Sequence, residues 1–141
     1  MSRFCWPSRV YWEDTDAGGV VYYANYLRFL ERARTEWLRA RGFSQQTLAA
    51  ELGILFTVVG LNIEYRRPGR LDDTLHVTCE PRAEGAASVS FQQLIYRNAM
   101  LEEQDLLASA DVRIACVDAR SFRPQRLPDF LVNALSAQER T

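Results

Sequence analysis

The stretch DTDAGGVVYYANYLRFLERARTEWLRAR, residues 14–41, decides much of the fold because most of it has the pattern of a long amphipathic helix. From residue 22 to residue 41, apolar side chains recur every three or four positions, as they do on one face of an α-helix. Charged side chains interleave with them, and Gly42 is a suitable helix stop. So broad an apolar face indicates burial along most of the helix. The face comprises Tyr22, Tyr26, Phe29, Ala33 and Trp37, widened by Leu27, Leu30 and Leu38.

The rest of the chain is predicted to form further helices and several strands. Ser44 is a suitable N-cap for a short helix that runs through residue 52 and ends at Gly53. Beyond Gly53 the apolar period becomes two, which is typical of strands, and Pro128 is a favourable first residue for a last short helix. Strands are expected at residues 9–12, 59–65, 75–80, 86–96 and 106–117, and the last helix is expected at residues 128–135.

This order of elements predicts an α+β protein with a long helix packed against one face of a strongly curved antiparallel sheet. With 141 residues the chain has the size of one domain, expected to span residues 1–141, and it can bury a core without metals or disulfides. One such sheet leaves an edge strand open. We therefore expect two copies to pair their sheets across a two-fold axis as a dimer.

Composition excludes several classes of function. The formal net charge of −1 gives no reason to expect binding to nucleic acid or to an anionic membrane. All 17 basic residues are arginine, so a Schiff-base lysine and a P-loop lysine are both excluded. The three cysteines, Cys5, Cys79 and Cys116, form no CxxC pair and are typical of buried thiols in a reducing compartment. No apolar run is long enough to span a bilayer, and no charged-then-apolar leader precedes the domain, so a cytoplasmic location is expected.

The acidic segment before the long helix permits two interpretations. Asp14 and Asp16 precede Gly18 and Gly19, which suit a sharp turn, and an aspartate near a helix start is stabilising in its own right. Alternatively, a carboxylate beside the unpaired amides of a helix start can attack a carbonyl and stabilise the resulting oxyanion. The residues alone favour the structural interpretation, and their spacing does not choose between the two aspartates.

The segment EDTDAGGVVYYANYLRFLERARTEWLR, residues 13–39, resembles the signature of hotdog-fold acyl-CoA thioesterases. Two branches are similar: the 4-hydroxybenzoyl-CoA thioesterases and the bacterial thioesterases associated with the Tol-Pal envelope system. FSQQTL at residues 43–48, LDDTL at 71–75, and CVD at 116–118 with a following RP resemble the Tol-Pal-associated branch. The similarity extends over nearly the whole chain and implies a hotdog fold with thioester hydrolase activity.

The resemblance also implies roles for individual residues. The catalytic carboxylate is expected to be Asp16, and the backbone N–H of Tyr23 is expected to polarise the thioester carbonyl. Asp16 would either attack the carbonyl or activate a water, and the sequence leaves both routes open. The Tol-Pal-associated branch usually has histidine at position 23, so no role of that histidine is carried over. Contacts with the substrate are expected from Gly19, Val21, Tyr22 and Tyr26. They are also expected from Arg66 and Arg67. Alternatively, these two arginines are charged residues at the end of a strand that contact only solvent.

The implied substrate is an acyl-CoA, with acyl carrier protein as an alternative carrier, and the implied assembly is a dimer that pairs into a tetramer. No cofactor or metal is expected. A serine or cysteine triad would have to use His76, the sole histidine, yet no GxSxG motif is present and His76 is expected on the surface. The rival function is a non-catalytic hotdog module that binds acyl groups or acyl carrier protein in envelope biogenesis. Presence of the complete acidic and glycine segment favours the enzyme.

Overall fold

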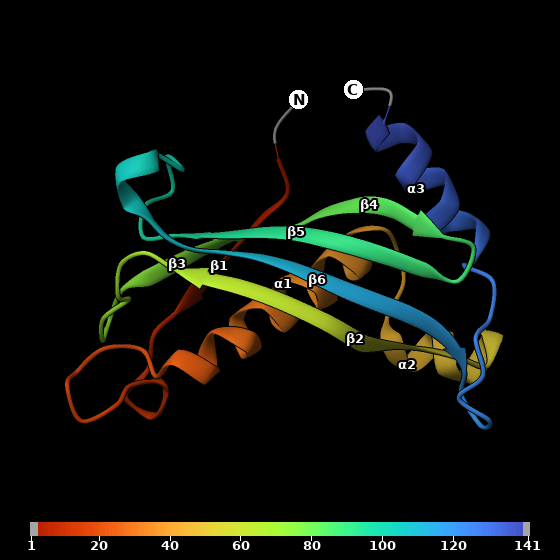
Figure 1. Ribbon diagram of the computed structural model, residues 1–141, viewed down its shortest axis with the longest axis horizontal. Coiled ribbons are helices and arrows are strands. Elements are labelled where there is room, and N and C mark those ends of the chain that lie inside the picture. The colour runs from red at the N-terminus through yellow and green to blue at the C-terminus, as the bar shows by residue number, and fades with distance from the viewer. Residues whose placement is uncertain (1–2, 140–141) are drawn as a thin grey trace.

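A computed structural model describes the backbone of residues 3–139 and the side chains of residues 3–136. These residues form one antiparallel sheet of six strands in the order β1-β3-β5-β6-β2, with β4 also beside β5 (Figure 1). Because β3 and β4 pair with successive parts of β5, they behave as one long strand interrupted at Cys79. The strands are β1 (Cys5–Arg9), β2 (Ile54–Tyr65), β3 (Thr74–Thr78), β4 (Glu80–Gly85), β5 (Ser88–Tyr96) and β6 (Leu106–Asp118).

The long helix α1 (Tyr26–Ala40) runs along one face of this sheet (Figure 1). Most of its predicted apolar stripe is buried, but Leu27 is 39% exposed, and Tyr22, which precedes the helix, is 48% exposed. Trp37 packs edge-on against Phe91 of β5 with ring centroids 5.3 Å apart. A polar contact adds to this packing: Gln93 of β5 is fully buried and donates to the backbone carbonyl of Leu30 at 3.0 Å. The helix and the sheet therefore share one core, and the α+β architecture expected from the sequence is confirmed.

Three strand predictions need correction. The first strand is residues 5–9, not 9–12, because Trp12–Asp14 forms the 3-10 turn η1. The strand expected at 59–65 begins at Ile54, and a β-bulge between Val58 and Gly60 explains the error. A bulge inserts one extra residue, so the two-residue alternation is broken there. The strand expected at 75–80 is divided at Cys79 into β3 and β4, while the last two strands lie close to their predicted positions.

The helix predictions are correct in type and differ at their ends. The helix expected from residue 22 starts as a 3-10 turn, η2 (Tyr23–Asn25), and becomes α-helical at Tyr26. Ser44 caps the next helix by accepting the Thr47 N–H at 3.1 Å, as expected. That helix is α2 (Gln45–Thr47) followed by a π-helical turn, η3 (Leu48–Leu52), and it ends at Gly53, whose φ is +65°. The last helix is α3 (Asp129–Glu139) instead of 128–135.

Two of the three cysteines are buried, whereas Cys5 and the histidine are partly exposed. Cys79 and Cys116 are buried as predicted, and burial raises the pKa of both thiols, while Cys5 is partly exposed. His76 is half-buried and lies on the sheet face opposite to the buried side chains of Leu75 and Val77; burial lowers its pKa. No helix within residues 3–139 is long and apolar enough to cross a membrane.

Candidate active site

Asp14 is a structural residue that fixes the loop before α1. It is only 3% exposed, and its carboxylate accepts the Tyr11 N–H at 2.8 Å and the Asn25 side-chain amide at 2.7 Å. Its backbone carbonyl accepts the Tyr22 N–H at 2.9 Å. One buried aspartate thus joins three points of the chain and holds the acidic loop against the helix start. Of the two roles considered for the acidic segment, Asp14 therefore has the structural one.

Asp16 lies two residues further on, in a tight turn at the surface. A β-bridge between Thr15 and Val21 closes the turn, and Gly19 has a φ of +79°, a conformation that glycine adopts without strain. The Asp16 side chain is exposed, and its Oδ1 accepts the Gly18 N–H at 2.8 Å. A Cβ at Gly18 would lie 3.3 Å from that oxygen. The glycine pair therefore allows the turn to fold closely around the carboxylate.

The helix start offers backbone donors next to this turn. Among the described residues, neither the Tyr23 N–H nor the Ala24 N–H donates to a backbone carbonyl, whereas the Asn25 N–H donates to the Tyr22 carbonyl at 2.8 Å. Unpaired amides in the first turn of a helix carry partial positive charge. Two donors are therefore available to an anionic or carbonyl oxygen.

A surface groove of about 360 Å³ is lined by both Asp16 and Tyr23, while Ala24 is not part of its lining. All but one of the site residues expected from the sequence line it; the exception is Gly19, which shapes the turn but does not reach the groove. The sequence reasoning assigned no site role to three further lining residues, Val20, Tyr65 and Pro68. The expected residues in the lining are Asp16, Val21, Tyr22, Tyr23, Tyr26, Arg66 and Arg67.

Tyrosine rings form the wall of the groove nearest the helix start. Tyr65 lies between Tyr23 and Tyr26, with ring centroids 6.5 Å and 5.3 Å away, and Tyr22 lies 5.0 Å from Tyr23. The Tyr65 hydroxyl donates to the Tyr23 carbonyl oxygen at 2.8 Å. Burial raises the pKa of the Tyr26 and Tyr65 phenols, so both stay protonated at neutral pH. The wall is therefore aromatic, which suits an apolar acyl group.

Arg66 and Arg67 lie in another part of the groove lining, and each of them makes a polar contact with another residue of the protein. Arg66 pairs with Glu103 at 2.7 Å, and Arg67 donates to the Leu106 carbonyl at 2.7 Å. These contacts join the end of β2 to η4 (Glu103–Asp105) and the start of β6. Both arginines thus have a structural role, and the Arg66 side chain is still 47% exposed.

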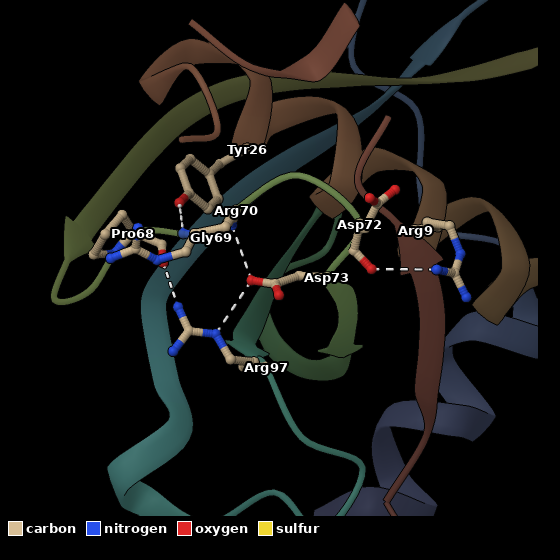
Figure 2. Close-up of polar contacts among 8 residues, drawn as sticks. All are labelled: Arg9, Tyr26, Pro68, Gly69, Arg70, Asp72, Asp73 and Arg97. Atoms are coloured by element: carbon tan, nitrogen blue, oxygen red, sulfur yellow. Dashed lines mark hydrogen bonds and ion pairs between the residues drawn. The ribbon is translucent and has the colours of Figure 1, made fainter. Parts of the chain in front are cut away.

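The segment after these arginines, residues 68–73, is braced against α1 and against Arg97, which directly follows β5 (Figure 2). Tyr26 of α1 accepts the Gly69 N–H through its hydroxyl at 2.9 Å. Asp73 accepts from the Arg70 N–H at 2.9 Å and pairs with Arg97 at 3.2 Å, and Arg97 also donates to the Pro68 carbonyl. Pro68 and Tyr26 are consequently held as fixed parts of the groove lining.

A profile of the thioesterase-like superfamily matches residues 10–135. The chain belongs to this superfamily. It is 49% identical over 129 residues to the acyl-CoA thioester hydrolase YbgC of Escherichia coli O6:H1, covering 92% of each chain. It is 46% identical over 125 residues to the acyl-CoA thioesterase YbgC of Haemophilus influenzae, covering 89% of this chain and 88% of that protein.

Solved structures agree on the fold of this thioesterase superfamily member. A probable thioesterase from Bartonella henselae superposes with a TM-score of 0.81 at 34% identity, covering 90% of this chain and all 100% of that one. The 1,4-dihydroxy-2-naphthoyl-CoA thioesterase Slr0204 from Synechocystis superposes with a TM-score of 0.85 at 24% identity, covering 98% of each chain. The predicted hotdog fold is confirmed.

Besides Val20 and Pro68, two further residues of the site region, Asn25 and Tyr65, were not predicted from the sequence. Asn25 completes the Asp14 contacts, and its position just before the helix was a usable signal because asparagine often bonds neighbouring backbone or side chains there. Tyr65 ends β2 immediately before Arg66 and Arg67, so a prediction that includes those arginines could have included it. Tyr65 and Tyr23 are 42 positions apart in the sequence, so no local sequence pattern indicates their contact.

Proposed function

We propose that this thioesterase hydrolyses acyl-CoA to the free acid and CoA, with Asp16 as the reacting carboxylate and the Tyr23 and Ala24 N–H groups as oxyanion donors. The observation that carries the proposal is that Asp16 and the helix start line one groove with a mostly aromatic wall. The named activity of the YbgC relatives supports the substrate class. Asp14 is not a candidate for the reacting group because its carboxylate is buried and doubly hydrogen-bonded.

The proposed reaction begins with the thioester carbonyl oxygen against the unpaired amides of Tyr23 and Ala24. Asp16 then attacks the carbonyl carbon to give a mixed anhydride, or takes a proton from a water that attacks instead. In both routes negative charge develops on the carbonyl oxygen, where one well-placed donor is worth about 2.7–4 kcal/mol in known hydrolases. Collapse of the tetrahedral intermediate expels the CoA thiolate, which needs no dedicated acid. In the first route a water then hydrolyses the mixed anhydride, which releases the free acid and regenerates the Asp16 carboxylate.

The rest of the groove is assigned to binding. Tyr22, Tyr26 and Val21 would contact the acyl group, and the exposed donors of Arg66 and Arg67 would contact CoA phosphates. Arginine suits this role because its planar fork binds two phosphate oxygens at once. Acyl carrier protein is the alternative carrier, since its pantetheine arm presents the same thioester. In this scheme Gly19 acts through the turn that carries Asp16.

A second copy of the chain would complete the site, and the shape of β2 supports this proposal. Val58 and Leu61 pair with Ile114 and Val112, so they lie on the core face, yet they are 50% and 42% exposed. Among the described residues β2 pairs with β6 alone, which leaves its other edge open. A partner sheet would cover these side chains and exclude water from the neighbouring groove. We further propose that dimers pair into tetramers and that the enzyme works in the cytoplasm in connection with the Tol-Pal system.

A panel of short, long and aromatic acyl-CoAs tests this function by thiol release. We expect steady-state hydrolysis of at least one class by the purified wild type, and the preferred class identifies the acyl group. The same acyl groups on acyl carrier protein decide between the two carriers. Binding without hydrolysis of every thioester would overturn the proposal and favour the non-catalytic module.

A further inference from the structure

The open edge of β2 has the groove at one end and a basic turn at the other (Figure 1). The groove lies at Tyr65, the last residue of β2, and the turn, residues 119–123, follows β6 beside the first residue of β2. Arg120 and Arg123 of this turn are exposed, and neither makes an ion pair with another described residue. Within one chain these arginines are therefore far from the groove and free to bind an anion.

The basic turn is held in a fixed place by its own hydrogen bonds. The Asp118 carboxylate accepts the Arg120 N–H at 2.9 Å and the Ser121 N–H at 2.8 Å. The Ala119 N–H donates to the carbonyl of Gly53 at 2.8 Å, directly before β2 begins. The position of the turn relative to the β2 edge is consequently set by the fold.

The exposed apolar side chains of β2 locate the two-fold axis of the proposed dimer. Val58, Val59 and Leu61 are 50%, 52% and 42% exposed and lie in the middle of the strand. An axis through this point, perpendicular to the sheet, lets one antiparallel contact between the two β2 strands cover these side chains in both copies. The two sheets then form one continuous sheet with the helices of both copies on the same face.

This pairing brings the basic turn of each copy to the groove of the other. Ile54, the first residue of β2, comes opposite the partner's Tyr65, the last residue of the same strand. Because Asp118 pairs with Ile54, two strand spacings, about 10 Å, separate Asp118 from that tyrosine. The partner's Arg66 and the partner's Arg67 follow that tyrosine in the sequence. The turn after Asp118 therefore adjoins the arginine side of the partner's groove.

We propose that Arg120 and Arg123 of one copy bind the phosphates of the CoA whose thioester occupies the partner's groove. The inference rests on the proposed function and on its dimer, and it names the residues by which a second copy completes the site. Each guanidinium can hold two phosphate oxygens at once, and a charged hydrogen bond of this kind is stronger than a neutral one.

The arginines of the groove alone supply little free positive charge. Arg66 is paired with Glu103 at 2.7 Å, which leaves Arg67 as the one groove arginine without an ion pair to a described residue. The nucleotide of CoA is a polyanion, with a diphosphate and a 3′-phosphate. Arginines from two copies around one place repel one another, and a bound polyanion relieves that repulsion. The proposed cluster is therefore suited to a nucleotide and not to the apolar acyl group.

The double variant Arg120→Gln with Arg123→Gln tests this, and Arg126→Gln is the matched control. Arg126 is an exposed arginine of the same segment, but it lines a different hollow beside α3. KM is measured for the best acyl-CoA of the panel and for the same acyl group on pantetheine, which lacks the phosphates. For the double variant we expect KM for acyl-CoA to rise at least about tenfold, the effect of losing one charged hydrogen bond. KM for acyl-pantetheine and Tm should stay at wild-type values, as should every value for Arg126→Gln.

Hybrid dimers identify the copy that supplies the arginines. One subunit carries Asp16→Asn, the other carries the double arginine substitution, and a different affinity tag on each allows purification. If the arginines act across the dimer, one groove combines an intact Asp16 with the partner's intact arginines. The hybrid should then have a wild-type KM and about half the wild-type kcat per dimer. If the arginines served the groove of their own chain, the hybrid would have the raised KM.

Three results would overturn the inference while leaving the proposed function standing. These are a wild-type KM for acyl-CoA in the double variant, an equal rise in KM for acyl-pantetheine, and a raised KM in the hybrid. A wild type that hydrolyses no thioester would overturn the proposed function instead. The Kd of a CoA thioether that lacks the thioester carbonyl would then measure the phosphate contact by itself, and an unchanged Kd in the double variant would overturn the inference too.

Discussion

Two aspartates separated by one residue have opposite surroundings in this protein, and the difference assigns their roles. Asp14 is buried and accepts two hydrogen bonds, from Tyr11 and Asn25. Asp16 is exposed in the groove and accepts one bond within its own turn, from Gly18. The first carboxylate is therefore committed to the fold, whereas the second retains oxygen lone pairs for chemistry.

Replacing the two aspartates should separate stability from activity. Asp14→Ala leaves two donors without an acceptor, and we expect it to lower the free energy of unfolding by about 2–3 kcal/mol. Asp16→Ala removes an exposed side chain and should change that free energy by less than about 0.5 kcal/mol. Urea denaturation of both variants measures this. Equal stability losses would contradict the assignment.

The thiols provide a second test at this scale. Burial raises the pKa of Cys79 and of Cys116, so at neutral pH both remain protonated as well as inaccessible. In the native protein we expect a thiol reagent to modify Cys5, which is partly exposed, and to leave the other two unmodified. Mass spectrometry of the labelled protein identifies the sites, and the unfolded chain, in which all three should react, is the control. Rapid native labelling of Cys79 would show that the core opens.

At the scale of elements, the sequence predicts the long helix and the succession of helices and strands along the chain, while local tertiary contacts decide the element ends and the order of strands in the sheet. The periodicity of α1 predicts most of its buried face, with Leu27 as the exception. The hydrogen bonds of Asp14 to residues around the helix start, by contrast, have no periodic pattern. The early part of β2 was missed because a bulge at Val58 and Gly60 shifts its alternation. Likewise the residues around Asp16 were predicted from a motif, whereas Tyr65 reaches the site only through the sheet.

The contact of Gln93 with α1 gives a test at this scale. Gln93 is fully buried, donates to the Leu30 carbonyl, and accepts from Arg34 at 3.0 Å. Gln93→Leu keeps the side-chain size but leaves the carbonyl and the guanidinium without these partners, so we expect a loss of about 2 kcal/mol. Gln92→Leu is the control, because Gln92 bonds the exposed Arg82 from the opposite face. Thermal or urea unfolding compares the two, and equal effects would show that the buried network contributes nothing.

At the scale of the whole molecule, the open edge of β2 predicts a dimer. Val59, the residue at the bulge, is 52% exposed, and Leu61 is 42% exposed on the core face. The double variant Val59→Glu with Leu61→Glu should dissociate the assembly, because it places two like charges in the proposed interface. Sedimentation velocity measures the change, and Val132→Glu on α3, where Val132 is 38% exposed, is the control. A wild type that sediments as a monomer at micromolar concentration would contradict the pairing.

The most direct test of the account compares kcat for wild type and Asp16→Asn on the acyl-CoA that the panel selects. The substitution keeps the size and shape of the side chain but removes its charge. We predict that kcat falls about 1,000-fold, in the range expected for loss of a positioned acid–base group, with unchanged Tm and unchanged binding of the CoA thioether. Equal values of kcat for the two proteins would contradict the central claim, because hydrolysis would then proceed without the carboxylate of Asp16.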